Sequence, residues 1–452
     1  MEGLRVHGDV ITPSDERYDE ARRLFYGGVD LRPAAIVRVA NASDVARVVT
    51  HARETGVELA VRSGGHNPVG YSLNDGGLVL DLHTMRRIDV DVTNRTAWAE
   101  TGATAVEFAT AAGAHGLGVS FGDTGSVGLG GLVTGGGVGY LARKLGLTID
   151  NLIAAEIVTA DGTIRRVDAE HEPDLFWAIR GGGGNFGVAT RFQFRLHDVE
   201  PFTGGLLMQP ASARLIEDFI AISAAAPDEL TTIANVMPAP PIPFVPAEWH
   251  NKLVAMSFVC YAGDPDAAER AIKPLRALAR PIVDMVKPMP YAQIYPPEDP
   301  SYHPIGTGRN LLVDAIDRRS AESIMDFLGS STATFSVAQL RVLGGAVSRV
   351  PDDATAYAHR SRFAMINIGN ILQSVDEMAA IKPWVDSFAR AIQRGPEAAY
   401  VNFLMNEGPA RVRQAYPGKT HDRLVAIKRR YDPTNLFHRN QNIPPGIQRR
   451  AP

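Results

Sequence analysis

The chain has 452 residues, of which 45% are hydrophobic and 21% are charged, and its formal net charge is −4 at pH 7. This length exceeds what one simple core needs, so two or three domains or subdomains are expected, while the small negative charge gives no support for a nucleic-acid or anionic-membrane partner. Cys260 is the only cysteine, which excludes an intrachain disulfide and a cysteine-based zinc site, and no metal is predicted.

The first predicted elements form a strand–helix–strand unit, which is typical of an α/β fold. A strand over 34–39 precedes a helix that Ser43 caps and Gly56 ends, and a strand over 57–61 follows at once. That strand runs into the turn Arg62-Ser63-Gly64-Gly65-His66-Asn67, and a strand over 78–82 comes after it. Two adjacent glycines let a main chain approach a flat or phosphorylated ligand where a Cβ would clash. This turn is therefore the first candidate binding site.

The next part of the chain alternates strands with glycine-rich segments. Thr104 and Glu107 form a capping box for a helix over 105–114, and the glycine-rich run 122–139 follows. A strand over 151–159 leads through the Asp161-Gly162 hairpin turn into a strand over 163–167. A helix over 175–180, a second glycine run over 181–187 and a strand over 188–196 complete this part.

The character of the chain changes at about residue 201. The segment 237–246 is proline-rich, and the dense glycine clusters end. Predicted strands over 253–261, 335–343 and 363–368 alternate with helices such as 265–278 and 378–392. This pattern predicts a second domain with an antiparallel sheet and helices on one face. A last helix over 420–430 stops at Asp432-Pro433.

The glycine segments do not match the two common nucleotide-binding patterns. Gly182, Gly184 and Gly187 have the spacing of a dinucleotide fingerprint, but they follow a helix and lead into a strand, which inverts the required order. The run 122–139 carries no phosphate-loop lysine. Bare backbone of this kind can still present successive N–H groups to a diphosphate. Close helix–sheet packing explains one such cluster, but three clusters together with His66 indicate a ligand site.

Taken together, these segments resemble the berberine-bridge-enzyme-like branch of the FAD-linked oxidases. The resemblance runs almost end to end. Its motifs are Arg62 to Asn67, Val127-Gly128-Leu129-Gly130-Gly131 with Gly135-Gly136-Gly137, Arg143-Lys144-Leu145-Gly146-Leu147, Asp150-Asn151, Asp174-Leu175-Phe176-Trp177 with Arg180 to Val188, Tyr400-Val401-Asn402-Phe403, and Tyr431-Asp432-Pro433 with Gln441-Asn442-Ile443-Pro444-Pro445.

The resemblance implies an α+β fold of the p-cresol methylhydroxylase type. Two α/β subdomains hold FAD, and a middle substrate domain contributes an antiparallel sheet covered by helices. The implied segments are 1–200 and 399–452 for the FAD-binding part and 201–398 for the substrate-binding part. The cofactor-binding residues that it implies are Arg62, Ser63, Gly64, Gly65, His66, Asn67, Gly122, Thr124, Gly125, Val127, Gly128, Gly131, Gly135, Gly136, Gly187, Val188, Tyr400 and Asn402.

The resemblance further implies that a ring nitrogen of His66 is bonded to the 8α carbon of FAD. Many relatives add a second bond from a cysteine, but the corresponding position here is Thr124, and Cys260 lies far away in the sequence. We therefore expect a single covalent link, as in the subgroup that resembles 6-hydroxy-D-nicotine oxidase, and a buried thiol for Cys260. Val127 matches a position described as an oxygen gate, which favours O2 as the electron acceptor.

The catalytic base is the least defined part of the site. Several relatives carry a tyrosine where this chain has Phe403, which cannot accept a proton. A base would then come from the middle-domain sheet, where Gln339, Arg341 and Asn367 lie on predicted strands; Tyr71, Tyr302 and His303 are loop alternatives. A structural role is equally open for each: an ion pair for Arg341, a satisfied buried amide for Asn367. None of the three strand residues is a strong base at neutral pH, which favours C–N over C–OH oxidation.

The leading prediction is an FAD-dependent oxidase that moves hydride from a C–H next to N or O of a small organic substrate to covalently bound flavin, with O2 reduced to H2O2. A flavin-dependent oxidative cyclase or dehydrogenase of secondary metabolism remains an alternative, as does a flavin-binding protein without turnover. Residues Met1 to Pro13 show neither a transit pattern nor a signal core, and no apolar stretch spans a bilayer. We expect a cytoplasmic protein; substrate identity and oligomeric state stay open.

Overall fold

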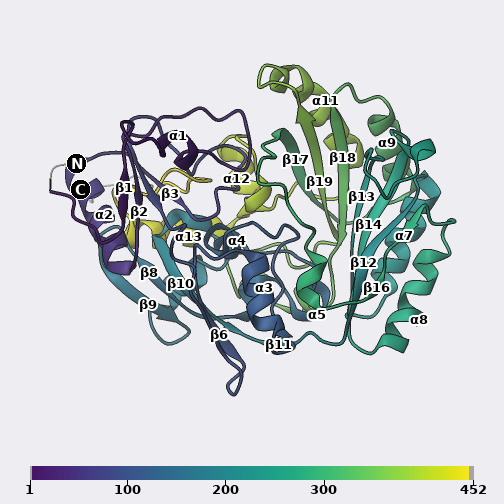
Figure 1. The fold of residues 1–452 in the computed structure, drawn as a ribbon, viewed down its shortest axis with the longest axis horizontal. Coiled ribbons are helices and arrows are strands. Elements are labelled where there is room, and N and C mark those ends of the chain that lie inside the picture. The colour runs from purple at the N-terminus through teal and green to yellow at the C-terminus, as the bar shows by residue number, and fades with distance from the viewer. Residues whose placement is uncertain (1–2, 447–452) are drawn as a thin grey trace.

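A computed structural model describes residues 3–446 and begins with a mixed four-stranded sheet (Figure 1). The strand order is β1-β2-β4-β3, in which β2, β4 and β3 run parallel and β1 is antiparallel. The elements are β1 Asp9–Ile11, α1 Tyr18–Ala21, β2 Ala35–Arg38, α2 Ala42–Thr55, β3 Leu59–Arg62 and β4 Leu78–Asp81. The predicted strand–helix–strand unit is therefore confirmed as β2, α2 and β3.

The start of α2 differs from the sequence prediction. Asn41 is the capping residue, because its Oδ1 accepts a hydrogen bond from the Asp44 N–H at 3.0 Å, and Ser43 lies inside the helix. Both residue types can cap a helix, and Asn41 has the extended backbone that the cap position requires (φ −163°, ψ 172°). Gly56 ends the helix as predicted, in a left-handed conformation (φ 71°).

A second sheet is antiparallel throughout, with the order β5-β6-β10-β8-β9. The predicted capping box of Thr104 and Glu107 is present at the start of α3, and the Asp161-Gly162 hairpin joins β8 to β9. The elements are β5 Ile88–Asp91, β6 Thr96–Glu100, α3 Ala105–Gly113, β7 Leu117–Gly118, α4 Leu129–Gly135, α5 Ala142–Leu145, η1 Thr148–Asn151, β8 Leu152–Val158, β9 Ile164–Asp168, α6 Pro173–Ala178, η2 Gly183–Asn185, β10 Val188–Arg195 and β11 His197–Asp198.

The middle of the chain forms an eight-stranded antiparallel sheet, ordered β15-β12-β14-β13-β18-β19-β17 with β16 added beside β12. Its strands are β12 Phe202–Pro210, β13 Leu230–Pro238, β14 Leu253–Ala262, β15 Val283–Asp284, β16 Lys287–Pro288, β17 Ile305–Val313, β18 Phe335–Val342 and β19 Ala364–Leu372. Helices α7 Ala213–Ala225, α8 Pro265–Arg276, α9 Arg318–Gly329 and α11 Glu377–Ile392 cover its outer face (Figure 1). Short helices η3 Ala247–Trp249, η4 Tyr291–Ile294 and α10 Ala346–Arg349 lie in its connections.

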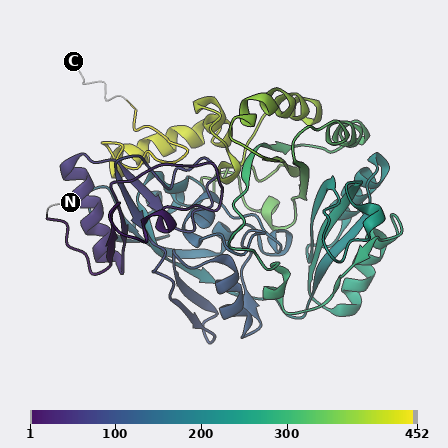
Figure 2. The same cartoon turned by 45° about the horizontal axis from the view of Figure 1, so that its top comes forward.

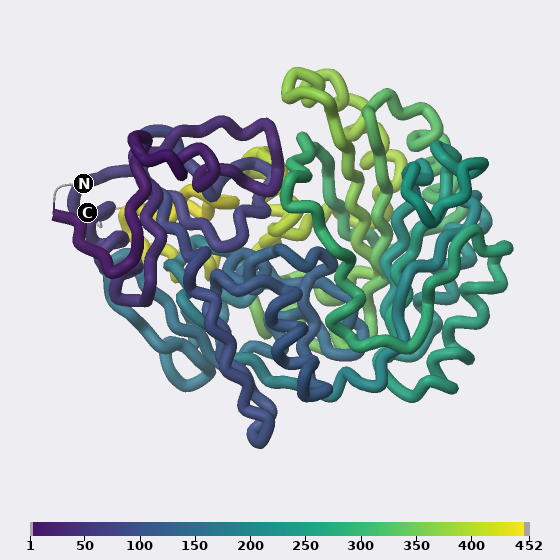
Figure 3. The backbone as a smooth tube through the Cα atoms, viewed as in Figure 1, coloured from purple at the N-terminus to yellow at the C-terminus, as the bar shows by residue number. Residues whose placement is uncertain are grey.

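The chain then returns to the N-terminal half, as its path in Figure 3 shows. Figure 2 shows this last segment lying over that half; it consists of η5 Val401–Phe403, α12 Pro409–Ala415 and α13 Lys419–Tyr431. Lys428 on α13 is fully buried, and its Nζ donates to Asp432 Oδ2 at 2.6 Å, to the Asn185 carbonyl at 2.7 Å and to the Phe437 carbonyl at 2.9 Å. The C-terminal segment is thereby fixed to the second glycine run.

The helix-free face of the large sheet packs on the N-terminal half. One apolar core contains residues of both parts, such as Ile233 and Met365 of the sheet with Phe121 and Tyr400. A buried bidentate ion pair also joins them: Arg360, which precedes β19, contacts both oxygens of Asp150 in η1 at 2.7 Å. Within residues 3–446, no helix is both long and apolar enough to cross a membrane.

Candidate active site

The His66 turn and the next glycine-rich segment meet where their main chains cross. A Cβ on either Gly64 or Gly128 would overlap the backbone nitrogen of the other glycine. Ser63 secures the crossing, because its Oγ accepts a hydrogen bond from the Gly130 N–H at 3.2 Å and donates one to the Thr101 carbonyl at 2.5 Å. Two segments that are 60 residues apart in the sequence thus form one wall.

A cavity of about 600 Å³ opens beside this wall. Its volume is within the range of ligand pockets, and all three glycine-rich segments line it, together with the Tyr400 to Phe403 stretch and the inner face of β18 and β19. The predicted cofactor residues that line it are Ser63, Gly64, Gly65, His66, Asn67, Gly122, Thr124, Val127, Gly128, Gly131, Gly187, Val188, Tyr400 and Asn402.

The remaining predicted cofactor residues, Arg62, Gly125, Gly135 and Gly136, lie behind the lining. Arg62 is buried and pairs with Asp81 at 2.7 Å, which ties the ends of β3 and β4 together. A Cβ on Gly135 would overlap the Asn402 amide, and one on Gly136 would come within 3.2 Å of the Tyr400 ring. These two glycines therefore admit the side chains that line the cavity, and Gly125 makes similar room for Val106.

The lining fits a large ligand with a flat ring and a phosphate chain, as FAD requires. At Gly131 and Gly184 an added Cβ would meet no atom within 4 Å, so it would project into the open cavity. The Tyr400 hydroxyl accepts hydrogen bonds from the Gly137 N–H at 2.8 Å and from Asn402 Nδ2 at 3.0 Å. Its own proton is left to donate, and burial raises the pKa of Tyr400 to about 12, so the phenol stays protonated at neutral pH.

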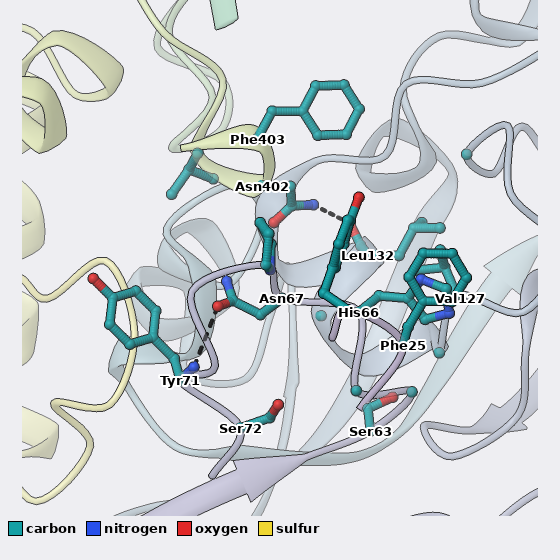
Figure 4. A pocket seen from close by; sticks show the side chains of 18 of the residues that line it. Phe25, Ser63, His66, Asn67, Tyr71, Ser72, Val127, Leu132, Asn402 and Phe403 are labelled. Carbon is teal, nitrogen blue, oxygen red and sulfur yellow. Dashed lines mark hydrogen bonds between the residues drawn. The ribbon is translucent and has the colours of Figure 1, made fainter. Parts of the chain in front are cut away.

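His66 lies in the cavity wall beside Phe25 and Val127 (Figure 4). Its imidazole stacks on the Phe25 ring with 4.3 Å between centroids, and its Nε2 is 2.8 Å from Ser126 Oγ. Burial lowers the pKa of His66 to about 4, although the Glu298 carboxylate and the Ser126 contact oppose the shift. The imidazole is therefore neutral at pH 7 and retains a lone pair for bond formation.

The same burial effect in His359 gives a pH prediction. His359 is 6% exposed, its Nε2 lies 2.8 Å from the Gln414 carbonyl, and burial lowers its pKa from 6.5 to about 4. Above pH 6.5 the side chain is neutral in both states, whereas between pH 6.5 and 4 the unfolded chain binds a proton that the folded chain excludes. His359 therefore lowers the free energy of unfolding as the pH falls, by up to about 3 kcal/mol. His359→Gln should weaken the acid dependence of the urea midpoint between pH 7 and 4.5, and an unchanged dependence contradicts the assignment.

A row of amides crosses the large sheet, and one of its members, Asn367, lines the cavity. Asn235, Gln339, Asn367 and Asn310 are direct cross-strand partners on β13, β18, β19 and β17, so they share one face. Asn367 is half-buried and lines the cavity. The alternative structural role considered for it, a fully buried amide, is therefore wrong. Gln339 donates from Nε2 to Asn235 Oδ1 at 3.1 Å, and it does not line the cavity within residues 3–446.

Gln339 and Arg341 converge on Asp123, which sequence reasoning did not single out. Arg341 Nη2 lies 2.6 Å from Asp123 Oδ2, and Gln339 Nε2 donates to the same oxygen at 3.1 Å. Arg341 is buried and forms an ion pair with Asp123, which is the structural role considered for it from the sequence. Asp123 contributes the only carboxylate among the lining residues that the structure describes, and its Oδ1 has no hydrogen-bond partner within residues 3–446. Its position in the run 122–139 was the one available sequence signal.

The loop candidates differ in their access to the cavity. Tyr71 and Tyr302 line the cavity, and Figure 4 shows Tyr71 across Asn67 from His66. Burial raises the pKa of both phenols, which makes them poor bases at neutral pH. His303 is within 3.3 Å of the Phe25 carbonyl through Nδ1 and does not line the cavity in the described chain. Sequence reasoning also missed Phe25, Tyr26 and Arg439, which carry no motif.

Comparison with known proteins identifies the class. An FAD binding domain family matches residues 33–168, and the family described as berberine and berberine like matches residues 399–444. The chain is 30% identical to (R)-6-hydroxynicotine oxidase of Paenarthrobacter nicotinovorans over 98% of each chain, and 31% identical to an FAD-linked oxidoreductase of Dictyostelium discoideum over 97% of this chain and 95% of the relative. The crystal structure of 6-hydroxy-D-nicotine oxidase from Arthrobacter nicotinovorans superimposes with a TM-score of 0.87 at 28% identity, covering 98% of this chain and 99% of that one.

The fold and the site therefore define an FAD-dependent oxidoreductase with the α+β fold predicted from the sequence. The chain belongs to the berberine-bridge-enzyme-like family of FAD-linked oxidoreductases. The resemblance and FAD as the cofactor are confirmed. A chitooligosaccharide oxidase shares the fold with a TM-score of 0.82, at 23% identity over 97% of this chain and 98% of that one.

Proposed function

We propose that this chain is an FAD-linked oxidase of small amines, with the flavin bonded to His66 and O2 as the electron acceptor. The bound flavin would supply the hydride acceptor. Residues 1–200 and 399–452 would hold the cofactor and residues 201–398 the substrate; positions 1–2 and 447–452 lie outside the described residues. The observation that carries the proposal is one cavity, which is lined by the glycine wall with His66 and by residues of β18 and β19, Asn367 among them.

The chemistry of the histidine supports one covalent link. A neutral imidazole is the nucleophilic form, and burial keeps His66 in that form at pH 7. Thr124 lines the cavity, and it stands where the resemblance implies a second linking cysteine in many members of the family. A hydroxyl cannot replace the thiolate in that role. Cys260 is fully buried on β14 and does not line the cavity of the described chain.

The residues around the substrate space favour C–N oxidation. Phe403 and Asn367 line the cavity, and neither can accept a proton from a substrate hydroxyl. Loss of hydride from carbon next to a neutral amine places positive charge on nitrogen and needs no base. The carboxylate of Asp123 can stabilise that charge through Oδ1. The similarity to (R)-6-hydroxynicotine oxidase supports an amine substrate.

Anaerobic bleaching of the flavin tests the substrate class. We expect cyclic amines to bleach the absorbance, and air to restore it with one H2O2 formed per amine oxidised. Aromatic alcohols and sugars serve as comparison substrates. Bleaching by alcohols alone would contradict the amine assignment, and bleaching that only an artificial acceptor reverses would favour the dehydrogenase alternative. A product of ring closure without peroxide would favour the cyclase.

Asp123→Asn tests the carboxylate. The substitution keeps the acceptor oxygen for Arg341 and Gln339 but removes the charge, so kcat should fall by about 10²-fold for an amine while the flavin content stays unchanged. Thr124→Ser, at the next position in the lining, is the matched control. An unchanged kcat in Asp123→Asn would exclude a catalytic role for the carboxylate.

A further inference from the structure

His66 is the first member of a hydrogen-bonded chain that ends on a carboxylate. Its Nε2 lies 2.8 Å from Ser126 Oγ. The Ser126 hydroxyl in turn forms a hydrogen bond with Glu298 Oε2, and the Ser126 N–H donates to Glu298 Oε1 at 2.9 Å. Both oxygens of Glu298 thus engage the same serine. Nothing in the proposed oxidation of substrate uses this chain.

The direction of these hydrogen bonds fixes the tautomer of His66. An ionised carboxylate only accepts, so the Ser126 hydroxyl gives its proton to Glu298. The Ser126 oxygen must then accept from His66, which places the imidazole proton on Nε2. Nδ1 is left with a free lone pair, and it has no hydrogen-bond partner within residues 3–446. Phe25 stacks on the ring and limits its rotation.

We propose that Ser126 and Glu298 are positioning residues for the attachment of the flavin, which present Nδ1 of His66 to the 8α carbon and accept the proton released at Nε2. This inference rests on the proposed covalent link. It assigns Nδ1 as the linked nitrogen. In these three groups the imidazole carries the nucleophilic nitrogen, the hydroxyl follows it and the carboxylate ends the chain, so that each member orients the one before it.

The step balances with O2 as the oxidant. A bond forms between Nδ1 and the 8α carbon, one C–H bond of the 8α methyl group breaks, and the N–H bond at Nε2 breaks as its proton moves through Ser126 to Glu298. The two electrons of the C–H bond enter the flavin ring, and its proton is released to solvent. O2 then takes two electrons and two protons to give H2O2, which returns the ring to its oxidised state. The sum is one imidazole, one methyl group and one O2 converted to one N–C link and one H2O2.

The position of Glu298 adds a structural condition. The residue lies in the connection between η4 and β17, whereas His66 and Ser126 belong to the N-terminal half. The carboxylate therefore reaches Ser126 only when the connection packs against that half. Attachment of the flavin then depends on assembly of both halves of the chain.

The test measures how fast the link forms. Full-length protein produced without flavin is mixed with FAD, and acid-stable flavin per chain is followed by gel fluorescence and intact mass. We expect Ser126→Ala and Glu298→Gln to slow the appearance of the linked species by about 10- to 100-fold, with FAD still bound in a form that acid releases. Ser126→Thr and Glu298→Asp keep the hydroxyl and the carboxylate, and they should recover most of the wild-type rate. Asp299→Asn, on the same loop, is the matched control and should link at the wild-type rate.

The outcomes separate the two proposals. Wild-type protein without acid-stable flavin would overturn the covalent link itself. A linked wild type with Ser126→Ala and Glu298→Gln at the same rate would overturn only the role of the serine and the glutamate. Equal slowing in Asp299→Asn would also overturn that role, because a change in the packing of the loop would then explain the slower rate. Failure of Ser126→Thr and Glu298→Asp to recover the rate would overturn it for the same reason. Peptide mapping that finds the flavin on Nε2 would overturn the assignment of Nδ1.

Discussion

His66→Ala should abolish acid-stable flavin in the purified protein. The wild-type chain should give a yellow acid pellet, because the proposed link bonds the flavin to the imidazole. The variant should release all of its FAD into the supernatant, since its remaining contacts are non-covalent. The glycine wall and Tyr400 are unchanged in the variant, so FAD should still bind at neutral pH. Absorbance of pellet and supernatant after acid precipitation is the measurement.

A second histidine variant controls for the handling of the protein. His171→Ala removes an exposed imidazole whose only side-chain contact in the described chain is Asp168 at 2.8 Å. Its pellet should remain yellow. A colourless wild-type pellet, or a yellow His66→Ala pellet, would contradict the link at His66.

Lys428→Met should cause the largest loss of stability among single substitutions in the C-terminal segment. Lys428 and Asp432 are both fully buried, and removal of the ammonium leaves the Asp432 carboxylate in the interior without its cation. Two carbonyls, those of Asn185 and Phe437, also lose their donor. We expect the apparent free energy of unfolding to fall by about 3–5 kcal/mol, measured by urea denaturation. Because Asn185 lines the cavity, FAD retention should fall as well.

A second ion pair provides a control with the same spacing. Lys382 and Asp386 on α11 are also four residues apart with 2.6 Å between their charged atoms, but the Lys382 side chain is 68% exposed. Lys382→Met should change the free energy of unfolding by less than about 1 kcal/mol. In the double variant Lys428→Met/Asp432→Asn the uncompensated charge is gone, so part of the loss should be recovered. Equal effects of Lys428→Met and Lys382→Met would contradict the argument.

Local signals in the sequence predicted several elements of the fold, but not strands β12, β13 and β17 of the large sheet. The capping box of Thr104 and Glu107 and the Asp161-Gly162 turn act over a few residues, so their geometry follows from residue type. The switch from glycine-rich segments to alternating strands and helices likewise predicted the antiparallel sheet and its helical face. The cap of α2 was placed two residues late because Asn41 and Ser43 are both capable caps, and the backbone conformation selected Asn41.

The contacts between distant segments could not be derived in this way. Asp123 and Arg341 are separated by 218 positions, and Ser126 and Glu298 by 172. The strand pattern alone indicated Arg341 as a candidate. Its partner Asp123 lies in a glycine-rich loop, and the path of that loop depends on the crossing of Gly64 and Gly128. Glu298 lies in a loop without a motif, so its residue type gave no signal.

The sequence by itself indicated a ligand site of bare main chain and one histidine, because glycine spacing and turn chemistry are local properties of the chain. That the ligand is FAD followed from the resemblance to the FAD-linked oxidases. The tertiary structure decided which groups surround that histidine and which carboxylate lines the cavity. Those groups come from loops that residue type constrains weakly, and only the packing of the large sheet against the N-terminal half brings Ser126 to Glu298 and Asp123 to Arg341.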